Sequence, residues 1–215
     1  MKGSFAPGSD RGPLVAILAG GAGQRIGGAK PMTALGGRPL IAYPLEAARA
    51  AGLEVAVIAK RRSVLPPLDC ELVLEPDLPR HPLCGIVAAV KHGGGRPVVV
   101  LACDMPFLTA SLLWWLAGQR GAAVAQVDGC LQPLLARYVP ANLPALERTL
   151  GERASARAAV ARIDPVMVDE HALVRFGDPR RLCFNVNDAR DLQLARRWLA
   201  GEPTDAAARF VRGRG

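Results

Sequence analysis

The sequence predicts a three-layer α/β fold in which a mainly parallel sheet carries helices on both faces. Short apolar runs alternate with segments of helical periodicity, a pattern typical of parallel strands joined by helical crossovers. The first run, LVAILA (14–19), is apolar throughout and ends in glycines, as expected of a strand buried on both faces. With 215 residues, half of them apolar, the chain is long enough for one domain with a buried core.

The first half of the chain alternates regularly. Residues 41–51 have helix-period apolar positions and stop at Gly52, and EVAVIA (54–59) then predicts a second strand. Thr109 is the expected N-cap of a later helix. The other elements expected in this half are strands at 71–75 and 97–104 and helices at 85–93 and 109–118.

After residue 120 the pattern is looser. A strand is expected at 122–127, followed by a turn at Gly129, and LQPLLARYV (131–139) has no element assigned to it. The remaining expected elements are helices at 143–150 and 154–162, a strand at 166–168, a strand end in LCFNV (182–186), and a last helix over 188–200. We expect a loose leader at 1–12, a single domain at 13–200 and a flexible basic tail at 201–215.

Composition excludes several classes of function. The net charge of +8 favours phosphorylated ligands, but aromatic residues are only 5% and no basic stripe is interleaved with them, so no nucleic-acid partner is expected. No apolar run reaches the roughly 18 residues of a membrane span, and no signal-peptide pattern is present, so no membrane partner is expected. The five cysteines lack zinc-binding spacing, which predicts reduced thiols in a cytoplasmic protein.

The segment LAGGAGQRIGGAK (18–30) follows the first strand and combines glycines with Arg25 and Lys30. Glycines let backbone N–H groups approach an anion closely, and the two cations can neutralise phosphate charge. The spacing is not that of a P-loop, because Ala29 separates the last glycine from Lys30, nor that of the dinucleotide fingerprint, whose third glycine would come one residue before Gly27. A phosphate loop suited to a triphosphate is the prediction, with a flexible hinge as the alternative.

Two further segments carry candidate ligands. Asp104, in LACDMPFL (101–108), directly follows a strand, where a single carboxylate together with substrate phosphates could hold Mg²⁺; a turn or cap role is the alternative. Asn185 and Asn187 alternate across the expected strand end and so should project to the same side. Asn187 could reach a metal or phosphate, or belong to a helix cap with Asp188.

These segments, taken with GGRPLI, PLCGI and FNVND, resemble the molybdenum cofactor guanylyltransferases, or MobA family, over residues 14–200. The resemblance implies a Rossmann-like fold of the nucleotide-diphospho-sugar transferase type and a Mg²⁺-dependent nucleotidyltransferase. It further implies transfer of GMP from GTP to molybdopterin with release of pyrophosphate. GTP and molybdopterin are then the expected partners, with a molybdoenzyme acceptor or chaperone as a further candidate.

The resemblance also implies roles for individual residues. Arg25, Lys30 and Asp104 would be catalytic, with the cations on the phosphates and Asp104 on Mg²⁺. The expected nucleotide-binding residues are Leu18, Ala19, Gly20, Gly21, Gly23, Lys30, Asp77 and Asp104, with Asp77 near the guanine-contacting acid. Gln132 with Pro133, Asn185 and Asn187 would lie on the molybdopterin side.

The chain departs from the family pattern at a few positions. Ala29 stands where the family has an acid before the lysine, in a loop one residue shorter, and Gln132 stands where a histidine is common. Cytidylyl transfer to the same pterin, nucleotidyl transfer to a sugar phosphate and an inactive nucleotide-binding accessory protein remain the alternatives. For the transfer reaction no general base is expected, because a phosphate nucleophile is already ionised, and catalysis should consist of positioning and charge stabilisation.

Overall fold

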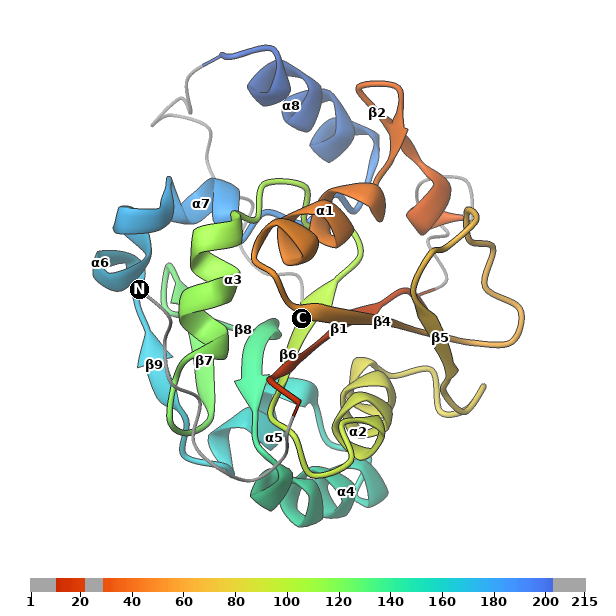
Figure 1. Cartoon of the computed structure of the whole chain (residues 1–215), viewed down its shortest axis with the longest axis vertical. Coiled ribbons are helices and arrows are strands. Elements are labelled where there is room, and N and C mark those ends of the chain that lie inside the picture. Colours follow the sequence, from red (N-terminus) through yellow and green to blue (C-terminus); the bar gives the residue numbers. More distant parts are fainter. Residues whose placement is uncertain (1–10, 22–28, 203–215) are drawn as a thin grey trace.

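The computed structural model describes residues 11–21 and 29–202, and its centre is a seven-stranded sheet with the order β5-β4-β1-β6-β8-β7-β9 (Figure 1). Strand β8 runs antiparallel to its neighbours β6 and β7, whereas the remaining pairs in this sheet are parallel. The strands are β1 (Leu14–Leu18), β4 (Glu54–Ala59), β5 (Glu71–Leu74), β6 (Val98–Ala102), β7 (Ala123–Val127), β8 (Cys130–Tyr138) and β9 (Val166–Val168). The predicted mainly parallel sheet is confirmed.

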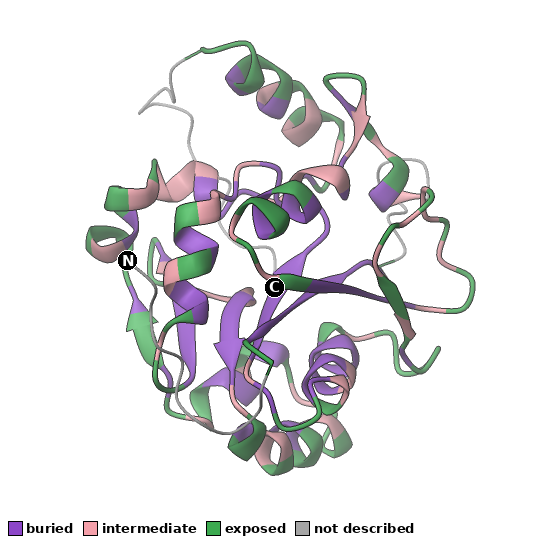
Figure 2. Ribbon diagram, in the orientation of Figure 1, coloured by how far each residue is buried: buried purple, intermediate pink, exposed green. Residues whose placement is uncertain are grey.

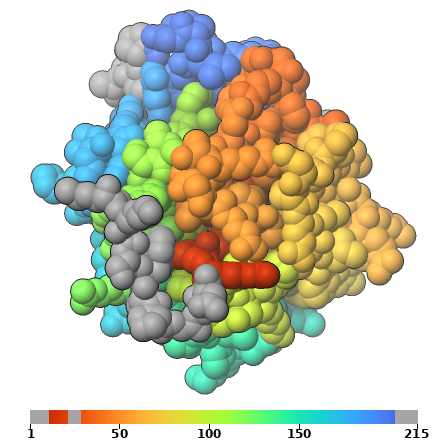
Figure 3. Space-filling model, viewed as in Figure 1, coloured from red at the N-terminus to blue at the C-terminus, as the bar shows by residue number. Residues whose placement is uncertain are grey.

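Helices cover both faces of this sheet, which confirms the three layers. On one face lie α1 (Ala42–Ala50) and α3 (Ala110–Ala117), seen in orange and green in Figure 3. On the other face lie α2 (Pro82–His92), α4 (Leu143–Gly151) and α5 (Ala156–Ala161).

The residues of strand β1 are all apolar because the strand is buried on both faces of the sheet. Val15 and Ile17 pack into the core on the α1 side, whereas Leu14 and Leu18 pack into the core on the α2 side. Since successive side chains of a strand point to opposite faces, a strand covered on both sides is apolar at every position. The central strands are accordingly buried along their length (Figure 2).

A third, smaller core cluster lies outside the sheet. It joins the hairpin of β2 (Ala34–Leu35) and β3 (Arg38–Pro39) to α8 (Ala189–Leu199), at the top of Figure 1. The Phe184 and Trp198 rings meet edge to face there, with centroids 4.8 Å apart. The 3₁₀ turn η2 (Lys30–Met32) leads into the hairpin, so this cluster fixes the segments on both sides of the candidate site.

The structure adds strand β8, to which the sequence pattern assigned no element. Asp128 and Gly129 both have positive φ angles (50° and 71°), and this Asp-Gly pair makes the tight turn between β7 and β8. Pro133 lies inside β8, where the pairing register with β7 shifts near Val124 and Ala125. A proline at a bulge interrupts the alternation of apolar and polar residues by which a strand is recognised in a sequence. The Asp128-Gly129 pair is nevertheless a signal from which this hairpin could have been predicted.

The expected strand end at 182–186 is wrong. Residues 183–187 are irregular, and the Val186 N–H donates a 3.0 Å hydrogen bond to the carbonyl of Asp104 rather than to a sheet ladder. Asn185 and Asn187 therefore do not owe their positions to strand alternation. Short helical segments not foreseen from the sequence are η3 (Pro140–Asn142), α6 (Glu170–Leu173), η4 (Val174–Phe176) and α7 (Pro179–Leu182).

The two predicted caps are confirmed. The Thr109 side chain accepts from the N–H of Leu112, and that of Asp188 accepts from the first turn of α8. Residues 1–10 of the expected leader and 203–215 of the expected tail lie outside the described residues. Within the described part of the chain, no helix has the length and apolar character needed to cross a bilayer.

Candidate active site

The site lies at the carboxyl ends of β4, β1 and β6. The chain leaves β1 toward β4 and β5 and later returns to the other side of β1 as β6, so the strand order reverses at β1. Ligands of open α/β sheets bind in the crevice at such a point. The Cys103 N–H donates to the Leu18 carbonyl (3.2 Å) and the Ala19 N–H donates to the Ile58 carbonyl (2.8 Å), which fixes the start of the glycine-rich turn between the two neighbouring strands.

Three predicted site residues come together at this edge. Asp104 follows β6 and is only 4% exposed, and its carboxylate forms an ion pair with the Lys30 ammonium. Lys30 also donates a 2.8 Å hydrogen bond to Asn187 Oδ1. The cluster thus combines one lysine, one buried carboxylate and one amide oxygen from three distant parts of the chain.

Asn187 is held in place from the helix that follows it. Its backbone N–H donates to Asp191 Oδ2 (2.8 Å), and its side-chain amide donates to the Asn185 carbonyl (3.2 Å). Burial raises the pKa of Asp191, against the hydrogen bonds it accepts. Because the side-chain NH₂ of Asn187 donates to the Asn185 carbonyl, its side-chain oxygen Oδ1 is the atom that faces Lys30.

A second polar pair lies on the other side of β1 and was missed by sequence reasoning. Glu75 follows β5 and is 8% exposed, and its Oε1 is 3.7 Å from the Lys60 ammonium at the end of β4. Lys60 also donates to the Pro76 carbonyl (2.7 Å). Burial raises the pKa of Glu75, and the charge of Lys60 opposes that rise.

The Glu75 carboxylate lies directly against two glycines. A Cβ atom on Gly20 would come 1.8 Å from Glu75 Oε1, and one on Gly85 would come 3.2 Å from Oε2 and 2.6 Å from Leu18 Cδ2. Any side chain at position 20 would therefore require the Glu75 carboxylate to shift. Glu75 was recognisable as the last residue of the run ELVLE, but its contact with Gly20 depends on the pairing of β5, β4 and β1.

The other predicted residues are distributed around this crevice. Asp77 is exposed beyond β5, close enough for its charge to oppose ionisation of Glu75. Gln132 is half-buried on β8 at the same edge of the sheet, where its amide donates weakly to the Cys130 carbonyl (3.4 Å). Neither has a recorded hydrogen bond to Lys30, Asp104 or Asn187 among the described residues. The predictions for Gly23 and Arg25 fall on positions outside the described residues.

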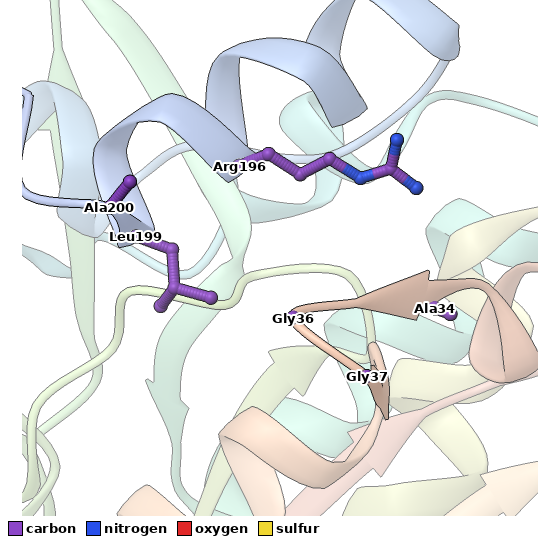
Figure 4. Close-up of a pocket in the computed structure, with 6 residues that line it drawn as sticks. All are labelled: Ala34, Gly36, Gly37, Arg196, Leu199 and Ala200. Carbon is purple, nitrogen blue, oxygen red and sulfur yellow. The ribbon is translucent and has the colours of Figure 1, made fainter.

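A cavity of about 480 Å³ lies elsewhere, between the β2–β3 hairpin and α8 (Figure 4). Among the described residues that line it, Arg196 alone is charged. Its guanidinium extends over the hairpin, whereas Leu199 points toward Gly36 (Figure 4). None of its lining residues belongs to the Lys30–Asp104–Asn187 cluster. This cavity is separate from the crevice at the sheet edge.

The donor set fits a magnesium ion that is completed by a substrate. Among the described residues, no group of three or more His, Cys, Asp or Glu side chains could hold a metal by itself. Mg²⁺ is commonly bound by one or two carboxylates, with substrate phosphates and water filling the other positions. Asp104 offers one such carboxylate, and Asn187 brings a neutral oxygen beside it.

A glycine-rich turn after β1, together with a lysine and a buried aspartate at the topological switch point, is the arrangement of an α/β protein that binds a nucleotide. The chain belongs to the family of the MobA-like NTP transferase domain, which matches residues 15–166.

Proteins similar in sequence and in structure support this family assignment. The chain is 33% identical to a molybdenum cofactor guanylyltransferase of Pseudomonas putida over 183 residues, covering 78% of this chain and 94% of that protein. It is 31% identical over 208 residues to the enzyme of the same name from Sinorhizobium fredii, covering 89% and 93%. Among solved structures, the molybdopterin-guanine dinucleotide biosynthesis protein A of Archaeoglobus fulgidus superposes with a TM-score of 0.75 at 26% identity, covering 88% of this chain and all of that one.

Proposed function

We propose that this protein transfers GMP from GTP to molybdopterin and releases pyrophosphate. The observation that carries the proposal is the Lys30–Asp104–Asn187 cluster at the switch point beside the glycine turn. The names of the relatives from Pseudomonas putida and Archaeoglobus fulgidus support guanine as the base and molybdopterin as the acceptor.

In the proposed reaction, an oxygen of the terminal phosphate of molybdopterin attacks the α-phosphorus of GTP. A new P–O bond forms, the bond from the α-phosphorus to the bridging oxygen breaks, and its electron pair leaves with pyrophosphate. The nucleophile is already ionised, so the protein needs to supply orientation and positive charge rather than a base. Lys30 provides that charge at the crevice, held by Asp104 and Asn187.

Asp104 is the residue proposed to hold Mg²⁺. When bound, the ion supplies charge stabilisation for the phosphate oxygens. In the described structure Lys30 compensates the buried Asp104 charge, and Asn187 shares the same ammonium. A divalent cation held by Asp104 would neutralise this carboxylate in place of Lys30, and the Lys30 ammonium would then be available to a substrate phosphate.

The proposal is tested by pyrophosphate release from GTP, CTP, ATP and UTP, each with Mg²⁺ and with or without molybdopterin. Release that requires both GTP and molybdopterin is the expected result. Turnover with CTP and with no other nucleotide would show that the reaction is cytidylyl rather than guanylyl transfer. Turnover only after addition of a sugar phosphate would show that the acceptor is a sugar phosphate rather than molybdopterin. Nucleotide binding without any turnover would make the chain an accessory protein.

A further inference from the structure

Two aspartates lie at the start of α8, and their carboxylates bind different groups. Asp188 accepts from the N–H groups of Arg190 (2.8 Å) and Asp191 (3.0 Å), which makes it the cap of the helix. Asp191 accepts instead from the N–H of Asn187 (2.8 Å), a residue that precedes the helix. One acid therefore caps α8, and the other holds a residue of the candidate site.

The backbone around Asn187 is fixed by several hydrogen bonds. The Val186 N–H donates to the Asp104 carbonyl (3.0 Å), and the Asn187 side-chain amide donates to the Asn185 carbonyl (3.2 Å). These bonds hold the segment before α8 against the loop that carries Asp104. The bond to Asp191 fixes the backbone of Asn187 itself, and with it the direction in which the Asn187 side chain leaves the chain.

The chain of contacts continues from Asn187 to Lys30. The Lys30 ammonium donates to Asn187 Oδ1 (2.8 Å) and pairs with the buried Asp104 carboxylate. Burial raises the pKa of Asp191, and the positive charge of Lys30 opposes this rise, so the ammonium and the Asp191 carboxylate lie within electrostatic range of each other. Asp191 is thus linked to Lys30 through a single intervening side chain.

Helix α8 gives Asp191 a fixed support. Ala195 and Trp198, further along the helix, are buried in the third core cluster, which also contains Val186. Asp191 itself is half-buried in the first turn. A side chain on a packed helix is placed more precisely than one on a loop, so the position of the Asp191 carboxylate is set by the core.

We propose that Asp191 is a positioning residue of the active site, which orients the Lys30 ammonium toward the nucleotide phosphates through Asn187. The inference rests on the proposed nucleotidyl transfer. In this role the Asp191 carboxylate does not touch the nucleotide, because a negative charge beside a triphosphate would repel it. Asp191 acts through the hydrogen bond that it accepts, so the role requires an oxygen at this place rather than a charge.

The test compares Asp191→Asn with Asp191→Ala. Both variants remove the negative charge, but only asparagine keeps an oxygen that can accept from the Asn187 N–H. Equilibrium binding is measured with Mg²⁺ and without molybdopterin, for the nucleoside triphosphate that the wild-type protein binds best, which is GTP under the proposed function. Asp191→Asn should bind it within about threefold of the wild type, and Asp191→Ala about tenfold more weakly.

The same two variants in an Asn187→Ala background test the route of the effect. Because the proposed effect passes through the Asn187 side chain, Asp191→Asn and Asp191→Ala should then bind the nucleotide equally well. A tenfold difference that persists in this background would overturn the proposal. Equal binding by the two variants in the presence of Asn187 would overturn it as well.

Ser155→Ala is the matched control for a loss of stability. The Ser155 side chain caps α5, which carries no residue of the candidate site, by accepting from the Ala158 N–H (3.1 Å). The control should lose stability, as Asp191→Ala should, and bind the nucleotide like the wild type. Weaker binding in Ser155→Ala would attribute the effect of Asp191→Ala to lost stability and would count against the proposal.

If Asp191→Ala does not fold, Asp191→Glu decides. Glutamate keeps the charge but places its oxygens one methylene further from the helix, so this variant should bind the nucleotide more weakly than Asp191→Asn. Equal or tighter binding by Asp191→Glu would show that the charge matters rather than the place of the oxygen, and would overturn the proposal. Since molybdopterin is left out, nucleotide binding that depends on Asp191 as proposed, without any GMP transfer, would contradict the proposed function and leave this inference standing.

Discussion

Lys30 and Asn187 are 157 positions apart in the chain, and the Lys30 ammonium donates a 2.8 Å hydrogen bond to Asn187 Oδ1. The same ammonium forms an ion pair with buried Asp104. Lys30 begins η2, which leads to Leu35 of the third core cluster, and Asn187 directly follows Val186 of the same cluster. The spacing of the two residues across the crevice thus depends on packing outside the sheet.

This contact predicts that Lys30 and Asn187 act as a unit. We expect Lys30→Met and Asn187→Ala each to lower kcat/KM for GTP, and the double variant to lose less than the product of the two effects. For residues in direct contact the coupling energy is about 0.5–3 kcal/mol. Lys91→Met, on an exposed lysine that pairs with Glu147, is the control and should combine additively with Asn187→Ala. Additivity between Lys30→Met and Asn187→Ala would mean that their hydrogen bond has no part in turnover.

Asp104→Asn tests the metal assignment. The side chain keeps its shape and can still bond to Lys30 and its surroundings, so the melting temperature should change little. Turnover in Mg²⁺ should fall by about 10²–10³-fold because a positioned charge on the phosphates is lost. Pyrophosphate release is measured over a Mg²⁺ titration, with Asp69→Asn at the exposed Arg49 pair as the control. Undiminished turnover in Asp104→Asn would contradict a catalytic metal at this residue.

The parts of the fold and of the site that could be predicted from the sequence are those that depend on residues adjacent in the chain. The buried run of β1, the aspartate after β6 and the lysine after the glycines each follow from a few neighbouring residues. Glu75 and Lys60 were missed because their position depends on the order of β5, β4 and β1, which no local pattern contains. Asn187 was named from an alternation that does not exist, since residues 183–187 are irregular and are held by Asp104 and Asp191 instead.

The two glycines that follow Ala19 give a matched pair of substitutions. An alanine Cβ at position 20 would lie 1.8 Å from Glu75 Oε1, whereas at position 21 nothing lies within 4 Å. Gly20→Ala should therefore cost about 1–3 kcal/mol of unfolding free energy, as expected of overpacking, and Gly21→Ala should be close to neutral. Chemical denaturation of both variants checks this. Equal stabilities would show that Glu75 moves aside without cost.

The ion pair between Glu54 and Arg96 predicts a pH-dependent contribution to stability. Arg96 is buried, and its guanidinium donates to both carboxylate oxygens of Glu54, at 2.6 and 3.2 Å. The hydrogen bond from Arg96 lowers the pKa of Glu54 below its ordinary value of 4.5. A lowered pKa in the folded state gives stability that is present above pH 4.5 and is lost as the pH falls through the folded pKa. Because Glu54 is half exposed, solvent screening weakens the ion pair. Glu54→Gln should therefore lower the free energy of unfolding by about 1 kcal/mol at neutral pH.

The same substitution should leave the free energy of unfolding almost unchanged at a pH where Glu54 is protonated in the wild-type protein. A neutral carboxyl group and a carboxamide interact with Arg96 in similar ways. Urea unfolding of wild type and Glu54→Gln at neutral pH and at about pH 3 measures the difference. Glu46→Gln is the control, because Glu46 pairs with Arg38 where both side chains are exposed, and its effect should be small at either pH. A Glu54→Gln cost that stays constant, or grows, as the pH falls would show that the carboxylate charge is not what stabilises this contact.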